Sequence, residues 1–303
     1  MTVLDPAGIT ALPVPPALLG ESPLWHPDEQ VLYWVDIPGR VLHRFDPARG
    51  EHRAWPQPSD PACCVPLLGG GLLLAMRDGL WRFDPQRGER HLVAKPPYDP
   101  DRQRFNDGKA DALGRFWIGT LDDAREPNAA LYCHTPGRGL KRVAEGITVS
   151  NGLAFGVDGR TLLWADTKAH AITAFDVDAS DGSLSRRRTW RQFAARDAAQ
   201  PLTAYGGRPD GAAMDSEGGY WVAMFEGQRL LRLDAEGRTL AELPLPVRCP
   251  TMPCFGGADL RTLYITTARE KRPADELAAQ PLAGCVLQIR VAVPGLPANL
   301  ARL

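Results

Sequence analysis

The sequence predicts an all-β fold, a six-bladed β-propeller, because one short motif recurs along the chain and short apolar strands alternate with turns throughout. Four segments open with an oxygen-bearing side chain and reach a tryptophan 11 or 13 residues later. They open at Glu21, Asn106, Asn151 and Asp210 and reach Trp34, Trp117, Trp164 and Trp221. Marking every repeat by its opening position gives 21, about 63, 106, 151, 210 and about 254, with a period near 42–45 residues. Six repeats of four short strands at roughly this period are typical of a propeller.

Within four of the repeats, two apolar strands are joined by a short polar or glycine-containing turn, which is the pattern of a β-hairpin. The paired segments are 31–35 with 41–45, 71–76 with 80–83, 161–165 with 171–175, and 220–224 with 230–233. The 30 glycines and 28 prolines are spread along the chain, as expected where many turns join many strands. A two-sheet sandwich would fit these strands but would leave the repeat unexplained.

The remaining segments complete this arrangement. The one long interval, from 151 to 210, contains a polar segment from Phe193 to Gly207 that we interpret as a surface insertion. A strand around Ile9 to Val14 is expected to complete the last blade beside the strand 285–290. Because no linker interrupts the repeats, residues 1–303 are expected to form a single domain.

Composition excludes several classes of partner. The formal charge of -1 and the single short basic run 186–188 argue against a nucleic-acid partner. No run of about 18 apolar residues exists, so no membrane span is expected. The N-terminus lacks the features of a signal peptide. The chain has six cysteines and no C-x-x-C pair, which favours reduced thiols in a cytoplasmic protein. A propeller of this size is also expected to be a monomer.

The opening positions of the repeats predict a metal site. In a propeller the first strand of each blade lines the central channel, so equivalent positions lie on a ring at one end of it. Glu21, Asn106, Asn151 and Asp210 would place two carboxylates and two amide oxygens on this ring. Hard oxygen ligands suit one divalent cation such as Ca, Mg or Mn, and open sites of this kind also accept Zn or Fe.

Each opening position has a second interpretation, because Asn-Gly and Asp-Gly are common turn dipeptides. Any one of them alone is more often a turn than a ligand. The recurrence of four at one repeat position favours the metal site, since such groups are costly to bury together without a cation. The equivalent positions of the second and sixth blades fall near Cys63–Cys64 and Cys254, which are expected to contribute wall rather than ligands.

Arg104 lies two residues before Asn106, and residues two apart on an extended segment point to the same side. Its guanidinium would then reach the mouth of the site and bind ligand oxygens. Spacing alone equally allows a solvent-facing arginine on a loop.

Six segments together resemble the family of gluconolactonases and regucalcin, also called senescence marker proteins. They are Gly20–Trp25, Arg104–Lys109, Gly114–Thr120, Ser150–Leu153, Pro209–Gly211 and Cys254–Gly257, in family order over nearly the whole chain. The resemblance implies a six-bladed propeller with one catalytic divalent metal held by Glu21, Asn151 and Asp210. It also implies that Arg104 and Asn106 contact the substrate.

The chain departs from the family pattern at one place. Regucalcin-like members carry an acidic residue that touches the sugar, and the aligned position here is Ala124. Asp122, Asp123 or Glu126 could substitute for it, so the substrate need not be the family's best-known one.

The hypothesis is therefore a divalent-metal-dependent hydrolase that opens a sugar (aldono-) lactone to the sugar acid. The cation would polarise the carbonyl, and Asp210 would act as catalytic general base on water. The alternatives are a metal-dependent phosphoesterase and a calcium-binding regulatory or scaffold protein. The sequence contains no H-E-x-x-H or Gly-x-Ser-x-Gly pattern that would indicate a different hydrolase site. Among the six histidines, His134 and His170 are the two whose position relative to the channel is to be checked. Which lactone is bound depends on the loops 122–134 and 193–208.

Overall fold

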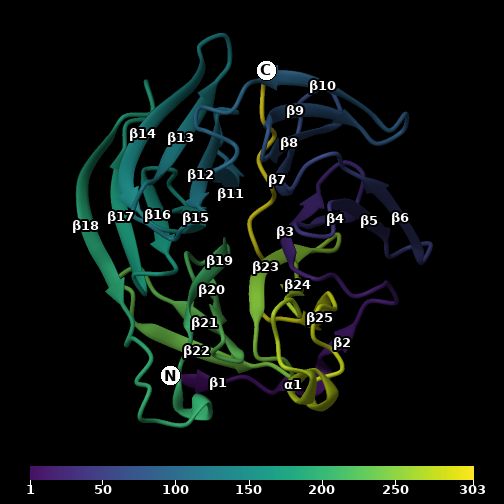
Figure 1. Cartoon of the computed structure of the whole chain (residues 1–303), viewed down its shortest axis with the longest axis vertical. Coiled ribbons are helices and arrows are strands. Elements are labelled where there is room, and N and C mark those ends of the chain that lie inside the picture. The colour runs from purple at the N-terminus through teal and green to yellow at the C-terminus, as the bar shows by residue number, and fades with distance from the viewer.

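The structure, a computed structural model, describes residues 1–303 and contains six β-sheets arranged in a ring around a central channel (Figure 1). The predicted six-bladed β-propeller is confirmed. In each sheet the strand nearest the channel is the first of its blade, and successive strands pair antiparallel toward the rim.

The bounds of the blades follow the expected repeats. The first has β3 (Gly20–His26), β4 (Val31–Asp36), β5 (Val41–Asp46) and β6 (Glu51–Pro56). The second has β7 (Pro61–Pro66), β8 (Leu72–Met76), β9 (Gly79–Asp84) and β10 (Glu89–Ala94). The third has β11 (Gln103–Ala110), β12 (Phe116–Asp122), β13 (Ala129–Thr135) and β14 (Gly139–Ile147).

The other three blades include both ends of the chain. The fourth has β15 (Ser150–Phe155), β16 (Thr161–Asp166), β17 (Ala171–Val177) and β18 (Leu184–Gln192). The fifth has β19 (Arg208–Met214), β20 (Tyr220–Phe225), β21 (Arg229–Leu233), β22 (Thr239–Pro244) and β1 (Thr2–Val3). The sixth has β23 (Pro250–Gly256), β24 (Thr262–Thr267), β25 (Leu287–Arg290) and β2 (Thr10–Ala11).

The N-terminal strand β2 pairs antiparallel with β25, as the sequence predicts, with Thr10 opposite Gln288. The strand β1 was not expected; it pairs parallel with β22 and adds a fifth strand to the fifth blade. The N-terminal segment therefore joins two neighbouring blades and contributes the outermost strand of each.

Only short helices interrupt the strands. The insertion from Phe193 to Gly207 contains one 3₁₀ turn, Leu202–Ala204, and is mostly exposed, in agreement with a surface insertion. A second 3₁₀ turn spans Pro6–Gly8, and α1 (Ala274–Ala279) lies between β24 and β25. No helix is both long and apolar enough to span a membrane. All six cysteines are free thiols.

The recurring tryptophans pack between blades. Trp34, Trp117 and Trp164 are fully buried on the second strands of their blades. The indole N–H of Trp117 donates to Asp111 at 2.9 Å, and that of Trp221 donates to Asp215 at 2.8 Å. A large apolar ring with a satisfied N–H is well suited to the tapered space between two sheets.

Every inner strand carries a register irregularity near its start, where one extra residue bulges from the ladder. These fall within Glu21–Leu24, Pro61–Cys63, Phe105–Gly108, Asn151–Ala154, Pro209–Ala212 and Pro250–Met252. A bulge bends the strand and re-aims its side chains, which places the repeat's opening residues at one end of the channel.

The sixth-blade position differs from the expectation. The irregularity in β23 lies between Pro250 and Met252, so Thr251 is the equivalent residue, and Cys254 lies three positions further along the strand. The second and sixth blades both lack a tryptophan on the second strand, so no such residue marks the repeat register there, and the sixth position was placed three residues too far along, near Cys254. The second-blade position, next to Cys63, is as expected.

The chain ends in a segment that crosses the channel, which we call the C-terminal strap (residues 292–303). In Figure 1 it runs as a yellow line from β25 through the middle of the ring toward the second blade. Leu296 N–H donates to Met214 O at 3.2 Å, Ala301 N–H to Pro66 O at 2.8 Å, and Arg302 N–H to Gly114 O at 2.9 Å. The strap therefore links the fifth, second and third blades at one end of the channel.

Candidate active site

The four opening residues converge at the other end of the channel. Glu21, Asn106, Asn151 and Asp210 lie near the starts of β3, β11, β15 and β19, and each is at least 92% buried. Asn106 Nδ2 donates to Asn151 Oδ1 at 2.9 Å. Glu21 and Asp210 lie close enough for each charge to act on the other.

The two amides are oriented differently. Asn106 Oδ1 accepts from Arg104 Nη1 at 2.6 Å, and Asn106 Nδ2 also donates to Ser150 O at 2.8 Å. Asn151 Nδ2 donates to Thr167 Oγ1 at 2.8 Å, which turns Asn151 Oδ1 toward the ring. An amide oxygen has two acceptor sites, so Asn151 Oδ1 can bind a further ligand while Asn106 is already held at both ends.

The two carboxylates have no cationic partner. Glu21 and Asp210 take part in none of the chain's ion pairs, and Glu21 Oε2 accepts only the backbone N–H of Ser22, at 3.1 Å. Burial, with repulsion from Asp210 and Asp107, raises the pKa of Glu21 well above its usual range. Burial raises the pKa of Asp210 to about 8, although Arg208 and Arg104 oppose the rise. The protein by itself leaves these negative charges uncompensated.

This donor set fits a hard divalent cation. Two carboxylates and the amide oxygen of Asn151 are the oxygen ligands that such ions take in proteins. No cluster of three or more His, Cys, Asp or Glu side chains is arranged to hold a metal ion, so a ring site here depends on the amide as its third donor. The residues implied as ligands therefore fit the ion.

Arg104 faces the site rather than solvent. It is 92% buried, and its Nη1 donates to Asn106 Oδ1 and, at 2.9 Å, to Phe105 O. Burial lowers the pKa of its guanidinium, and repulsion from Arg125 and Arg77 adds to this effect. The spacing allowed Arg104 either to face solvent on a loop or to lie at the mouth of the site, and in the structure it lies at the mouth.

Comparisons with known proteins identify the family of this chain. Residues 19–269 match the model of the SMP-30/gluconolactonase/LRE-like region. The chain belongs to this family. It is 44% identical to 6-deoxy-6-sulfogluconolactonase of Pseudomonas putida over 283 residues, 92% of this chain and 94% of that protein. It is 35% identical to regucalcin of Danio rerio over 284 residues, 92% and 93% of the two chains.

Among solved structures, the calcium-binding protein regucalcin from Agrobacterium tumefaciens superposes with a TM-score of 0.91 at 28% identity, over the whole of both chains. The SMP-30/gluconolactonase propeller is thus present from end to end.

The sequence pattern did not indicate two residues of the site, Asp107 and Thr167. Asp107 is 96% buried; its Oδ2 accepts Leu153 N–H at 2.9 Å, while its Oδ1 has no protein partner. The sequence pattern assigned no role to Asp107, although it follows Asn106 within the same bulge. Thr167 orients Asn151 from the turn after β16, and no repeat signal marks it.

Two of the three acidic candidates, Asp122 at the end of β12 and Asp123 in the loop 123–128 that follows it, are already engaged within the protein. Asp122 Oδ1 accepts Ala124 N–H at 2.9 Å, and Asp123 forms an ion pair with Arg77 at 2.9 Å. Glu126 is exposed and forms no ion pair. Of the three residues expected to replace the missing acid, Glu126 alone has a free carboxylate.

The two histidines take different places. His134 lies on β13, the third strand of its blade, and is buried away from the channel. His170 lies in the turn after β16, and its Nε2 is 2.6 Å from the hydroxyl of Tyr205 in the insertion. The insertion is thereby tied to the loops that border the ring of Glu21 and Asp210.

Proposed function

We propose that this protein is a sugar lactone lactonase that hydrolyses its substrate at the ring of Glu21, Asn151 and Asp210, with one divalent cation held there. The observation that carries the proposal is a pair of buried carboxylates without a cationic partner beside an oriented amide oxygen. Support for lactone hydrolysis comes from the family and from the relative that is a 6-deoxy-6-sulfogluconolactonase.

The residues divide the chemistry between them. A bound cation would polarise the lactone carbonyl and offset the charge of the two carboxylates. Asp210 accepts the proton of the attacking water as general base. Water adds to the acyl carbon, the bond from that carbon to the ring oxygen breaks, and the ring oxygen takes up the proton that Asp210 accepted. Arg104 and Asn106, which are hydrogen-bonded to each other, orient the sugar at the mouth.

The test of this assignment is Asp210→Asn, with Asp28→Asn as the matched control because Asp28 is exposed on a turn of the first blade. Lactone opening releases acid, which a pH indicator follows with and without a chelator. We expect Asp210→Asn to lower kcat/KM by about 10²–10⁴-fold, the usual contribution of a general base, and Asp28→Asn to behave as wild type. Full turnover by Asp210→Asn with metal supplied would refute the assignment.

The same preparations decide between the alternatives. Turnover of a phosphoester in place of lactones would identify a phosphoesterase. Calcium binding without turnover of either substrate would identify a regulatory or scaffold protein.

We infer that the favoured substrate carries an anionic group remote from the lactone. Arg125 is exposed in the loop 123–128 and forms no ion pair, and its charge adds to the effect of burial, which lowers the pKa of Arg104. Its neighbour Arg77 is neutralised by Asp60 and Asp123. The P. putida relative's name specifies a sulfonated gluconolactone, and a free guanidinium suits such a group.

Arg125→Gln tests this inference, with the exposed Arg138→Gln as control. We expect Arg125→Gln to raise KM for 6-deoxy-6-sulfogluconolactone about 10-fold, the loss of one charge-assisted hydrogen bond at an exposed site. KM for gluconolactone itself should change little. Equal effects on both lactones would contradict the inference and leave the lactonase proposal intact.

We further propose that residues 1–303 act as a single domain and a monomer in the cytoplasm, where the six free thiols stay reduced. Size-exclusion chromatography that gave a dimer, or two separate unfolding transitions, would contradict this.

A further inference from the structure

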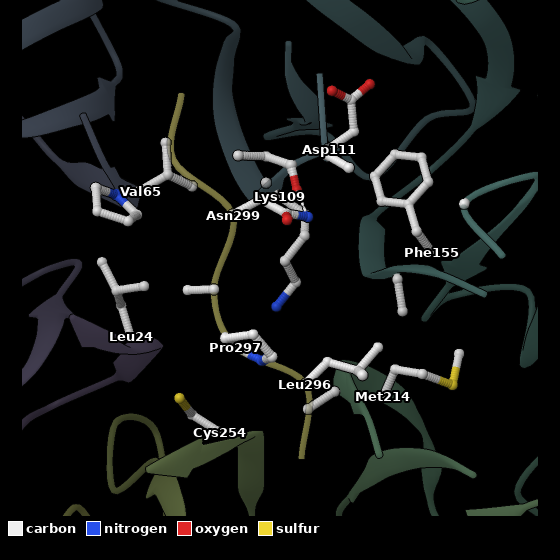
Figure 2. A pocket seen from close by; sticks show the side chains of 18 of the residues that line it. Leu24, Val65, Lys109, Asp111, Phe155, Met214, Cys254, Leu296, Pro297 and Asn299 are labelled. Atoms are coloured by element: carbon white, nitrogen blue, oxygen red, sulfur yellow. Dashed lines mark hydrogen bonds between the residues drawn. The ribbon is translucent and has the colours of Figure 1, made fainter. Parts of the chain in front are cut away.

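A cavity lies at the end of the channel opposite the ring of Glu21 and Asp210. It has a volume of about 480 Å³ and is formed by the ends of the inner strands together with the C-terminal strap. Figure 2 shows Leu24, Val65, Phe155 and Met214 around it, with Leu296 and Pro297 of the strap across it. Of its 30 lining residues 18 are hydrophobic, so its wall suits an apolar molecule.

One amino group points into this apolar space. Lys109 extends from β11, and Figure 2 shows its side chain reaching into the middle of the cavity. Its Nζ has a single acceptor, Ala212 O, at 3.5 Å, the outer limit of a hydrogen bond. Lys109 forms no ion pair, and Asp107, a carboxyl group whose pKa it lowers, lies deeper in the channel.

The other charged groups in the wall are already engaged. Asp111 Oδ1 accepts Leu113 N–H and Arg115 N–H, and its Oδ2 accepts Arg115 Nε–H and Trp117 Nε1–H. Arg115 is in turn neutralised by Asp111. Asp158 is exposed and accepts the N–H of Arg160. Asp158 has no cationic partner either, but it is exposed, and the ammonium of Lys109 is therefore the positive charge in this cavity that lacks a counter-ion.

The rim of the cavity is also apolar. Leu113 is 51% exposed and Val157 is 55% exposed, and both belong to its lining. Large hydrophobic side chains left in contact with water around a cavity are typical of an entrance for apolar ligands.

We propose that this cavity binds a small amphipathic carboxylate, with the anionic head on Lys109 and the apolar chain against Phe155 and the strap. A volume of about 480 Å³ lies within the range of small-molecule pockets. The head supplies the acceptor that Lys109 lacks, and the chain covers side chains that would otherwise face water. The cavity is separate from the lactone site, so the proposal stands independently of the substrate.

The experiment uses octanoate as the probe and 1-octanol as its neutral match, in titration calorimetry on the full chain. Lys109→Met keeps the apolar stem and removes the charge, and Lys141→Met is the control because Lys141 is exposed on the outer strand β14. We expect saturable octanoate binding by wild type and by Lys141→Met, and at least 10-fold weaker binding by Lys109→Met. Binding of 1-octanol should be the same in all three.

A second variant addresses the strap. Leu296→Glu places a negative charge at the partly buried wall, and we expect it to weaken octanoate binding while leaving lactone turnover unchanged. The urea unfolding midpoint of Lys109→Met reports that the variant is folded. Octanoate binding that is absent from wild type, or equal in wild type and Lys109→Met, would overturn the proposal.

Discussion

Glu21, Asp107 and Asp210 bring three carboxyl groups within electrostatic range of one another in a buried channel, and burial raises the pKa of each. Lys109 and Arg208 oppose this effect for Asp107 and Asp210 without forming an ion pair with either. A folded chain tolerates such a cluster when something else supplies positive charge. At the scale of single residues, this unbalanced charge is the strongest mark of function in the molecule.

A different buried group governs one part of the pH dependence of stability. His43 stacks on Trp34 with ring centres 4.9 Å apart, and burial lowers its pKa to about 4 from an ordinary value of 6.5. Between pH 6.5 and 4 the unfolded chain therefore binds more protons at this position than the folded chain. The contribution of His43 is complete above pH 6.5 and is lost as the pH falls through this window.

The variant His43→Phe keeps the stacking and cannot titrate. We expect its free energy of unfolding to fall less than that of wild type between pH 7 and pH 5, by about 2 kcal/mol. Urea unfolding of wild type and His43→Phe at pH 7 and pH 5 measures this difference. The channel carboxyl groups contribute equally to both proteins, so their effect cancels in the comparison. Parallel pH profiles for the two proteins would contradict the prediction.

At the scale of elements, the bulge near the start of each inner strand connects fold and site. In β15 it contains Gly152, whose φ is +60°. A Cβ there would lie 2.4 Å from the hydroxyl of Tyr220 and 2.9 Å from the carbonyl oxygen of Asp210. Glycine at this position lets β15 approach β19 closely enough for Asn151 and Asp210 to share one ring.

Gly152→Ala tests this close approach, and Gly50→Ala is its control because Gly50 has a φ of +68° with nothing within 4 Å of the added Cβ. Both variants incur the backbone cost of about 1–2 kcal/mol. Gly152→Ala should be less stable by about another 1–3 kcal/mol because it is overpacked, and should lose lactone turnover. Equal urea midpoints and unchanged turnover would show that the two strands have room to separate.

At the scale of the whole molecule, the N-terminal segment and the C-terminal strap tie together blades that are distant in sequence. Thr10 and Ala11 pair with β25, and Leu12 is 96% buried in a cluster with Trp25 and Trp34. The sixth blade thus depends on residues from both ends of the chain. A closed ring leaves no edge between its first and last blades.

Leu12→Ala should therefore destabilise the propeller by about 2–5 kcal/mol, as large-to-small changes in a core do. Leu18→Ala is the matched control, because Leu18 is 45% exposed, and its effect should stay within about 0.5 kcal/mol. Thermal unfolding compares the two. A transition temperature for Leu12→Ala no lower than that of Leu18→Ala would mean that the N-terminal segment does not hold the ring closed.

The sequence by itself determined the all-β class, the number of blades and the ring positions of Glu21, Asn106, Asn151 and Asp210. These follow from a local signal, a strand opening and its tryptophan, that repeats along the chain. That signal is absent from the second and sixth blades, and in the sixth the ring position was placed near Cys254 instead of at Thr251. The sequence also predicted the strand that pairs with β25, because Ile9 to Val14 has the pattern of a strand.

Only the tertiary structure decided which way the side chains point and what covers the far end of the channel. Arg104 faces the ring because Asn106 accepts its hydrogen bond, and Asn151 is turned by Thr167 from the next strand's turn. Lys109 lies in an apolar cavity because the strap, almost 190 residues later in the chain, folds back over it (Asn299 Nδ2 donates to Ala110 O, a separation of 189 residues). Such contacts join segments with no common pattern, since they depend on packing between blades rather than on any periodicity within one.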